Sequence, residues 1–117
     1  METAQKKTYG TLKISREVLA TIAEAAAQEI PGVYAIAGSF YDGVMGNRTP
    51  RGASVTVVDD IAEVRLRLVL ESDARIQDVA ARAQQSVKDA VQNMTGITVS
   101  KVNIVVAGIH YAAQEEK

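Results

Sequence analysis

The stretch that decides the fold is residues 61–71, which read IAEVRLRLVLE. Apolar and charged residues alternate along it, with the period of two that a β-strand imposes on its side chains. The apolar residues that would share one face are Val64, Leu66, Leu68 and Leu70. The charged residues that would share the other face are Glu63, Arg65, Arg67 and Glu71. The pattern predicts a strand with its leucines in a core and its charges on the opposite face.

An amphipathic helix is expected after this strand. Apolar residues recur at spacings of three and four from Ile76 to Met94, which places them along one side of a helix. Asp73 is expected to cap the N-terminus of this helix, because its carboxylate can accept a free backbone N–H of the first turn. Gly96 is expected to end the helix in a left-handed conformation.

The last strand is expected over residues 97–109. Its inward-facing phase shifts between Val99 and Val102, so a bulge is expected near Ser100-Lys101. A strand, a helix and a second strand in this order predict a right-handed crossover that leaves the two strands parallel.

The N-terminal half is expected to begin with another amphipathic helix. Ser15 is a good N-cap for it, and Pro31-Gly32 stops it. Short strands are expected over residues 33–37 and 53–58. Asp59-Asp60 is a plausible tight turn, which would join the second of these strands to residues 61–71 as an antiparallel hairpin.

The predicted order is therefore α-β-β-β-α-β, which indicates a two-layer α+β fold with a mixed four-stranded sheet. Each helix has one apolar stripe, so both helices are expected to cover the same face of the sheet. The other face would then be open. It would carry the charged residues Glu63, Arg65, Arg67 and Glu71 and the apolar residues Val69, Val105 and Ile36. Residues 9–111 are expected to form a single domain between a disordered tail, 1–8, and a loose tail, 112–117.

Composition excludes several classes of function. The chain has 117 residues, 13 Lys and Arg against 14 Asp and Glu, and no cysteine. The absence of cysteine rules out thiol catalysis, zinc–thiolate sites and disulfides. The net charge of −1 argues against a sequence-independent nucleic-acid binder, which normally carries a basic excess. No apolar run is long enough for a membrane span and the N-terminus has no signal peptide. A cytoplasmic protein is therefore expected, unless a partner holds it at a membrane.

The sequence contains few residues that could act in catalysis. His110 is the single histidine, and a lone histidine at the end of a strand is most often a surface residue. Asp59 and Asp60 are adjacent, so their carboxylates would point in different directions rather than act as a pair. We expect no enzyme activity, no metal site and no cofactor.

Residues 38–52 form a long connection without hydrophobic periodicity. Five residues in it are of types enriched in protein interfaces, namely Phe40, Tyr41, Met45, Arg48 and Arg51. Two interpretations stay open, because this segment could bind a partner or fold back over one end of the core. A third is RNA binding, since residues 43–46 read GVMG and a G-x-x-G loop occurs in KH domains. That loop joins two helices in a KH domain, whereas this one is expected to join two strands.

Several phrases of the sequence resemble the alkaline shock protein family of Gram-positive bacteria. They are residues 9–18 (YGTLKISREV), 30–33 (IPGV), 76–80 (IQDVA), 94–99 (MTGITV) and 102–104 (VNI). The resemblance spans about residues 9–109. The sequence departs from the family where many relatives have an aromatic-Gly pair before the second helix and this chain has Glu71-Ser72-Asp73.

The resemblance implies a protein without known catalytic residues that works by protein–protein interaction. Some members are stress-response proteins held at the cell envelope by a membrane-anchored relative, and some form homo-oligomers. The leading hypothesis is therefore a self-associating assembly module that binds such a partner through the open sheet face or the 38–52 segment. An alternative that the family suggests is a regulator of a fatty-acid synthesis enzyme such as acetyl-CoA carboxylase.

Overall fold

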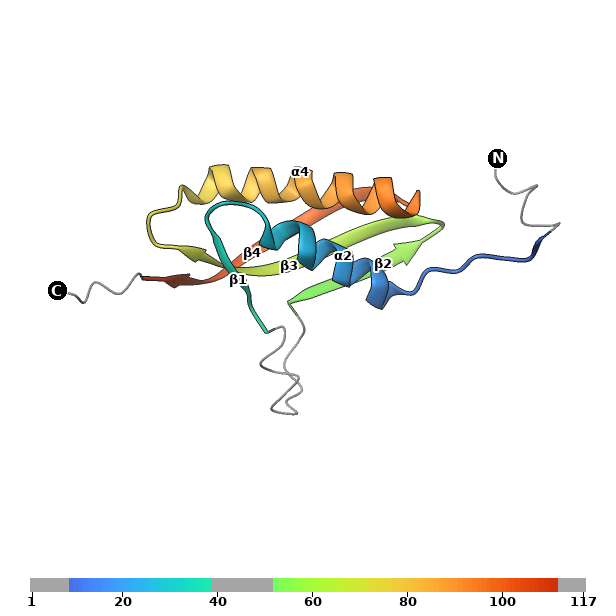
Figure 1. Cartoon of the computed structure of the whole chain (residues 1–117), viewed down its shortest axis with the longest axis horizontal. Helices are drawn as coiled ribbons and strands as arrows, with labels where there is room; N and C mark the ends of the chain where they lie inside the picture. Colours follow the sequence, from blue (N-terminus) through green and yellow to red (C-terminus); the bar gives the residue numbers. More distant parts are fainter. Residues whose placement is uncertain (1–8, 39–51, 112–117) are drawn as a thin grey trace.

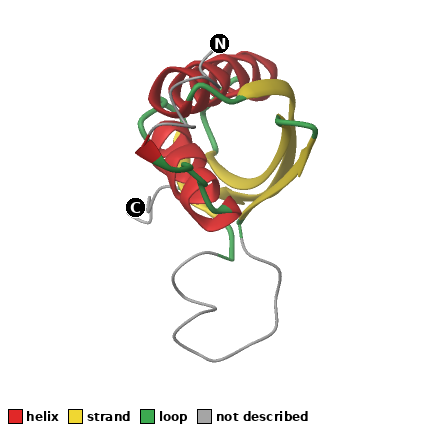
Figure 2. Ribbon diagram, turned by 90° about the vertical axis from the view of Figure 1, so that its right-hand side faces the viewer, coloured by secondary structure: helices red, strands yellow, loops and turns green. Residues whose placement is uncertain are grey.

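The computed structural model describes residues 9–38 and 52–111. Its elements are, in chain order, α2 (Arg16–Gln28), β1 (Val33–Ile36), β2 (Ala53–Val58), β3 (Ile61–Glu71), α4 (Ile76–Thr95) and β4 (Thr98–His110). This is the predicted α-β-β-β-α-β order. Both helices lie on one side of the sheet (Figure 1), and the sheet curves around the core between them (Figure 2). The predicted two-layer α+β fold is confirmed.

β3 is the central strand of a mixed four-stranded sheet. β4 runs parallel to it along one edge, from the Ile61↔Thr98 pair to the Glu71↔His110 pair. β1 and β2 both run antiparallel to it. The strand with the clearest alternation in the sequence therefore has neighbours on both edges, which buries its apolar face most completely.

β1 and β2 lie one after the other along the remaining edge of β3. β1 pairs with residues 68–70 and β2 pairs with residues 61–66. Arg67 lies opposite the gap between them, and its backbone bonds the residues on either side of the gap. The Ala37 N–H, just after β1, donates to the Arg67 carbonyl oxygen at 2.8 Å. The Arg67 N–H donates to the carbonyl oxygen of Gly52, just before β2, at 2.7 Å. The two short strands are thus two parts of one edge, interrupted opposite Arg67.

Two of the three predicted helix-capping residues are confirmed. Ser15 caps α2, since its hydroxyl accepts the Val18 N–H at 3.1 Å, and Gly96 ends α4 with a φ of 80°. The prediction that Asp73 caps the N-terminus of α4 was wrong. Arg75 occupies the N-cap position, and its side chain makes no capping hydrogen bond. Asp73 lies instead in a turn closed by the Ala74 N–H and the Glu71 carbonyl at 3.0 Å.

The predicted turn and bulge are both present. Asp59 and Asp60 have φ values of 54° and 65°, the pair of positive angles that a type I′ hairpin turn requires. The β3–β4 register moves from Ala62↔Val99 to Glu63↔Lys101, so the extra residue is Ser100. This residue re-phases β4, which is why the sequence alternation broke there.

The core lies between the helices and the inward face of the sheet. The fully buried residues of β3 are Ala62, Val64, Leu66, Leu68 and Leu70. The helix residues buried in the same cluster are Leu19, Ala20, Ala23, Ala26, Ala27, Val79, Ala83, Val87 and Val91. Small alanines dominate the buried side of α2, so this helix can approach the sheet closely.

The expectation that Ile36 lies on the open face was wrong. Ile36 is 8% exposed and pairs with Leu68, so it belongs to the core. The register shifts between Val33↔Leu70 and Ala35↔Val69, which makes Tyr34 an extra residue in β1. A regular alternation from Val33 would have turned Ile36 outward, and the extra residue turns it inward.

Candidate interaction surface

The face of the sheet that lies opposite the helices brings together four of the predicted site residues. Arg65, Arg67 and Val69 alternate along β3 with the buried leucines. Val105 of β4 pairs with Arg67, so it lies beside these residues on the same face. We call this set of residues, Arg65, Arg67, Val69 and Val105, the open face.

The two arginines of the open face carry charge that the described part of the chain does not neutralise. Arg65 is exposed and Arg67 is half-buried, and within residues 9–38 and 52–111 neither side chain makes an ion pair or a hydrogen bond. The acidic residues at the two ends of β3 are occupied. Glu63 accepts a hydrogen bond from Asn103 at 2.8 Å, and a Glu71 oxygen lies 3.2 Å from His110 Nδ1. Among the described residues, a positive patch therefore remains in the middle of the face.

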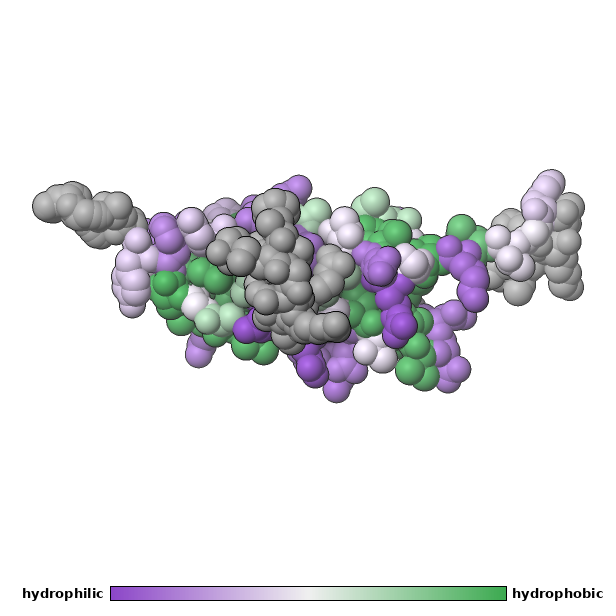
Figure 3. Space-filling view, turned by 90° about the horizontal axis from the view of Figure 1, so that it is seen from below, coloured by the Kyte–Doolittle hydropathy of each residue, from purple (hydrophilic) through white to green (hydrophobic). Residues whose placement is uncertain are grey.

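Apolar surface adjoins these charges. Val105 is 48% exposed although it lies in the middle of a strand. Val69 pairs with Gly108, which has no side chain to shield it. The view from below shows hydrophobic and hydrophilic side chains interspersed over the described surface (Figure 3). Arginine is enriched in protein interfaces, and the core of an interface is more apolar than the rest of the surface, so this face can pack against another protein.

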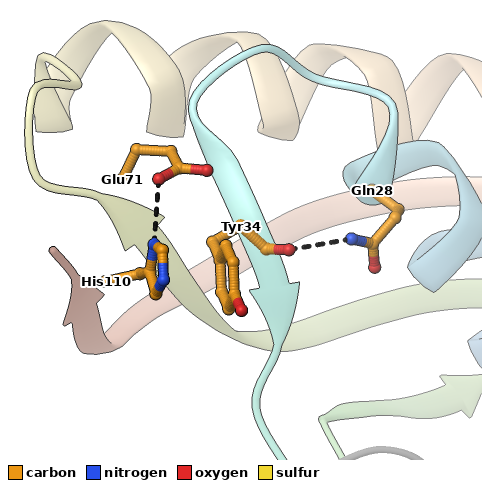
Figure 4. A network of polar contacts seen from close by, with 4 residues as sticks. All are labelled: Gln28, Tyr34, Glu71 and His110. Carbon is orange, nitrogen blue, oxygen red and sulfur yellow. Dashed lines mark hydrogen bonds and ion pairs between the residues drawn. The ribbon is translucent and has the colours of Figure 1, made fainter. Parts of the chain in front are cut away.

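A second cluster, which sequence reasoning did not find, lies where β1 and the ends of β3 and β4 meet (Figure 4). The Tyr34 and His110 rings are stacked, with centroids 3.7 Å apart and planes at 4°. His110 also lies 3.2 Å from Glu71, and Gln28 of α2 donates to the Tyr34 carbonyl at 3.2 Å. Tyr34 is the extra residue of β1, so only the three-dimensional register brings it to His110. No local sequence pattern could have indicated this pair.

The arrangement around His110 is typical of a structural residue. Its imidazole is stacked on one side and held by a carboxylate, and its side chain is 37% exposed. Over residues 9–38 and 52–111, no group of three or more His, Cys, Asp and Glu side chains could hold a metal ion. Neither α2 nor α4, the two long helices of these ranges, has the length and hydropathy that a membrane-spanning helix needs.

The other five predicted site residues belong to the segment between Gly38 and Gly52. Phe40, Tyr41, Met45, Arg48 and Arg51 lie outside the described residues, and so does the G-x-x-G sequence at 43–46. The part of the candidate surface that the structure describes is therefore the open face of the sheet.

Fold and surface together define a class: a two-layer α+β domain in which the described helices leave one sheet face uncovered. Two arginines on that face have no partner among the described residues. Solved structures with this fold include the MamM CTD. A variant of that domain aligns with a TM-score of 0.51 and 14% identity, over 79% of this chain and 93% of the other. Another MamM CTD structure aligns with a TM-score of 0.51 and 11% identity, over 83% and 99%. At such low identity these alignments describe the fold alone.

Sequence relatives narrow the class to a family. The model of the alkaline shock protein 23 family, described as having a cell envelope-related function, matches residues 4–111, and this chain belongs to that family. The Bacillus subtilis (strain 168) protein YqhY, itself uncharacterized, is 29% identical over 112 residues, covering 92% of this chain and 83% of YqhY. The B. subtilis protein YloU is 29% identical over 107 residues, covering 86% and 89%.

Proposed function

We propose that this chain is a non-catalytic assembly module that self-associates and binds a membrane-anchored protein at the inner side of the cell envelope. The observation that carries the proposal is the open face, where Arg65 and Arg67 are unpaired within the described residues and stand beside Val69 and Val105. Membership in a family with a cell envelope-related function supports the cellular setting.

The two faces of the sheet differ in what covers them among the described residues. The helices bury the inward face, so its leucines need no further partner. Neither of the two described helices covers the outward face, and Val105 in the middle of β4 is 48% exposed. A partner would remove this apolar area from water and supply acidic groups to the arginines, which gives both affinity and a defined orientation.

The test is the mass of the protein in solution by size-exclusion chromatography with light scattering, across a hundredfold range of concentration. The unmodified chain is expected to form dimers or larger species as concentration rises. The double variant Arg65→Glu, Arg67→Glu is expected to remain at the monomer mass of 12.5 kDa, because two reversed charges would then face the partner.

A matched control is the double variant Arg82→Glu, Lys88→Glu. Both residues are exposed on α4, away from the open face, and the change in net charge is the same. This control is expected to associate like the unmodified chain. Unchanged association of the Arg65, Arg67 variant would rule out the open face. A strict monomer at all concentrations would instead favour a regulator that acts on another protein, and co-purification from native cells would then identify that protein.

A further inference from the structure

A pocket of about 560 Å³ is lined by residues of the first turns of α2, by the start of β2 and by three residues of the open face. Arg16 of α2 and Arg65 and Arg67 of β3 line it, together with Glu17. Ala20 and Val105 are among its apolar lining residues. Three arginines from two elements far apart in the sequence therefore border one hollow.

Among the described residues that line this pocket, the charges do not cancel. Three of these residues are arginines and one, Glu17, is acidic. In the part of the chain that the structure describes, none of the three arginines makes an ion pair or a side-chain hydrogen bond. Guanidinium groups present several N–H donors that match the oxygens of a phosphate or a carboxylate. The pocket is thus suited to an anionic group.

The apolar residues that line the pocket set a second requirement on its ligand. Ala20 lies on the sheet-facing side of α2 and Val105 on β4, so the anionic group would enter beside aliphatic surface. The volume lies in the range of roughly 300–1,000 Å³ in which proteins bind small organic molecules. Inorganic phosphate alone would leave the aliphatic part of this space unused.

We infer that the pocket binds a small organic anion with a phosphate or carboxylate head and an apolar body. The arginines hold the head, and the aliphatic residues contact the body. The same chemistry occurs in a free molecule and in the headgroup of an anionic lipid, so the experiment separates these two sources. The inference does not depend on self-association.

The test uses the full chain labelled with ¹⁵N and follows its amide signals during titration with octyl phosphate, octanol and inorganic phosphate. Octyl phosphate is expected to produce saturable shifts at residues that line the pocket, such as Ala20, Ser54 and Val105. Octanol and inorganic phosphate are each expected to bind at least about tenfold more weakly, since each lacks one of the two groups. Equal binding of octanol, or shifts spread over the whole surface, would overturn the inference.

Arg16→Ser is the deciding variant. Arg16 lies on α2 and outside the open face, so this change leaves the proposed self-association surface intact. It is expected to weaken octyl phosphate binding about tenfold, the effect of losing one charge-assisted contact. Arg82→Ser on the exposed side of α4 is the control and should bind like the unmodified chain. Unchanged affinity in Arg16→Ser, with an intact amide spectrum, would contradict the assignment.

Co-sedimentation with phosphatidylcholine vesicles, with and without phosphatidic acid, separates the two sources. Sedimentation that requires phosphatidic acid and falls in Arg16→Ser would identify a lipid headgroup as the ligand. Octyl phosphate binding without any sedimentation would identify a free molecule. Failure of both arms would end the inference, and it would leave the light-scattering result for self-association untouched.

Discussion

The backbone at Gly52 lies directly against Ala37, where β2 begins and the chain leaves β1. A Cβ atom added to Gly52 would stand 2.5 Å from the Ala37 carbonyl oxygen, closer than real Cβ contacts allow. Both residues bond the same partner, since Arg67 receives one hydrogen bond from Ala37 and gives one to Gly52. The edge of the sheet thus continues across the interruption because residue 52 has no side chain.

Gly52→Ala is therefore expected to destabilise the fold. The new methyl group would meet backbone and the Ile36 side chain, and neither can move without opening the β1–β3 pairing. A loss of about 1–3 kcal/mol in the free energy of unfolding is expected, as for other overpacked sites. Urea denaturation followed by circular dichroism measures it. Gly108→Ala is the control, because its Cβ would come no closer than 3.7 Å to Val69 and should change stability by less than about 0.5 kcal/mol.

The Tyr34–His110 stack is expected to contribute measurable coupling to stability. A stacked aromatic pair stabilises the fold by about 0.5–1.5 kcal/mol beyond the effect of its buried area. The Tyr34 and His110 rings are partly exposed, so their coupling is expected at the lower end of this range. A double-mutant cycle with Tyr34→Ala and His110→Ala, measured by urea denaturation, isolates that term. Tyr34→Phe keeps the ring and should behave like the unmodified chain. Strict additivity of the two alanine changes would show that the stack contributes nothing.

Leu68→Ala should be among the most damaging single changes in the chain. Leu68 is 0% exposed in the middle of β3, so its truncation removes packed methyl groups and leaves a cavity, at a cost of about 2–5 kcal/mol. Thermal and urea unfolding measure the loss. Val105→Ala, on the opposite face and 48% exposed, should cost well under about 1 kcal/mol in the monomer. Similar losses at both positions would contradict the assignment of the two faces.

Two glutamines of α4 bond the backbone of β4. Gln92 Oε1 accepts the Val99 N–H at 2.9 Å, and Gln84 Nε2 donates to the Val102 carbonyl at 3.1 Å. Gln92→Ala is expected to cost about 1 kcal/mol and to accelerate hydrogen exchange at the Val99 amide, which would lose its acceptor. The Gln85 side chain donates to Asp89 one turn further along α4, so Gln85→Ala should leave the exchange rate of the Val99 amide unchanged. Equal exchange rates in both variants would contradict the role of Gln92.

The elements could be predicted from the sequence because each is a local pattern. Strict alternation over residues 61–71 leaves one strand orientation that buries the leucines, and Gly96 ends α4 with the positive φ that glycine tolerates. The phase change in the apolar pattern of residues 97–109 indicated the bulge that the β3–β4 register places at Ser100. The positions of Arg65, Arg67, Val69 and Val105 on one face follow from the same alternation and from the parallel pairing of β3 and β4.

The three-dimensional contacts could not be predicted, because they depend on register between distant segments. The extra residue in β1 places Tyr34 against His110 and turns Ile36 into the core, and nothing within β1 itself signals this shift. The pocket likewise needs α2 to lie beside β3 before Arg16 can join Arg65 and Arg67. Side-chain periodicity is a property of the chain alone and determined the helices, the strands and their buried faces. The contact between the Tyr34 and His110 rings and the gathering of the arginines depended on the packed sheet. Several strand registers satisfy the same alternation of side chains, and only packing selects one of them.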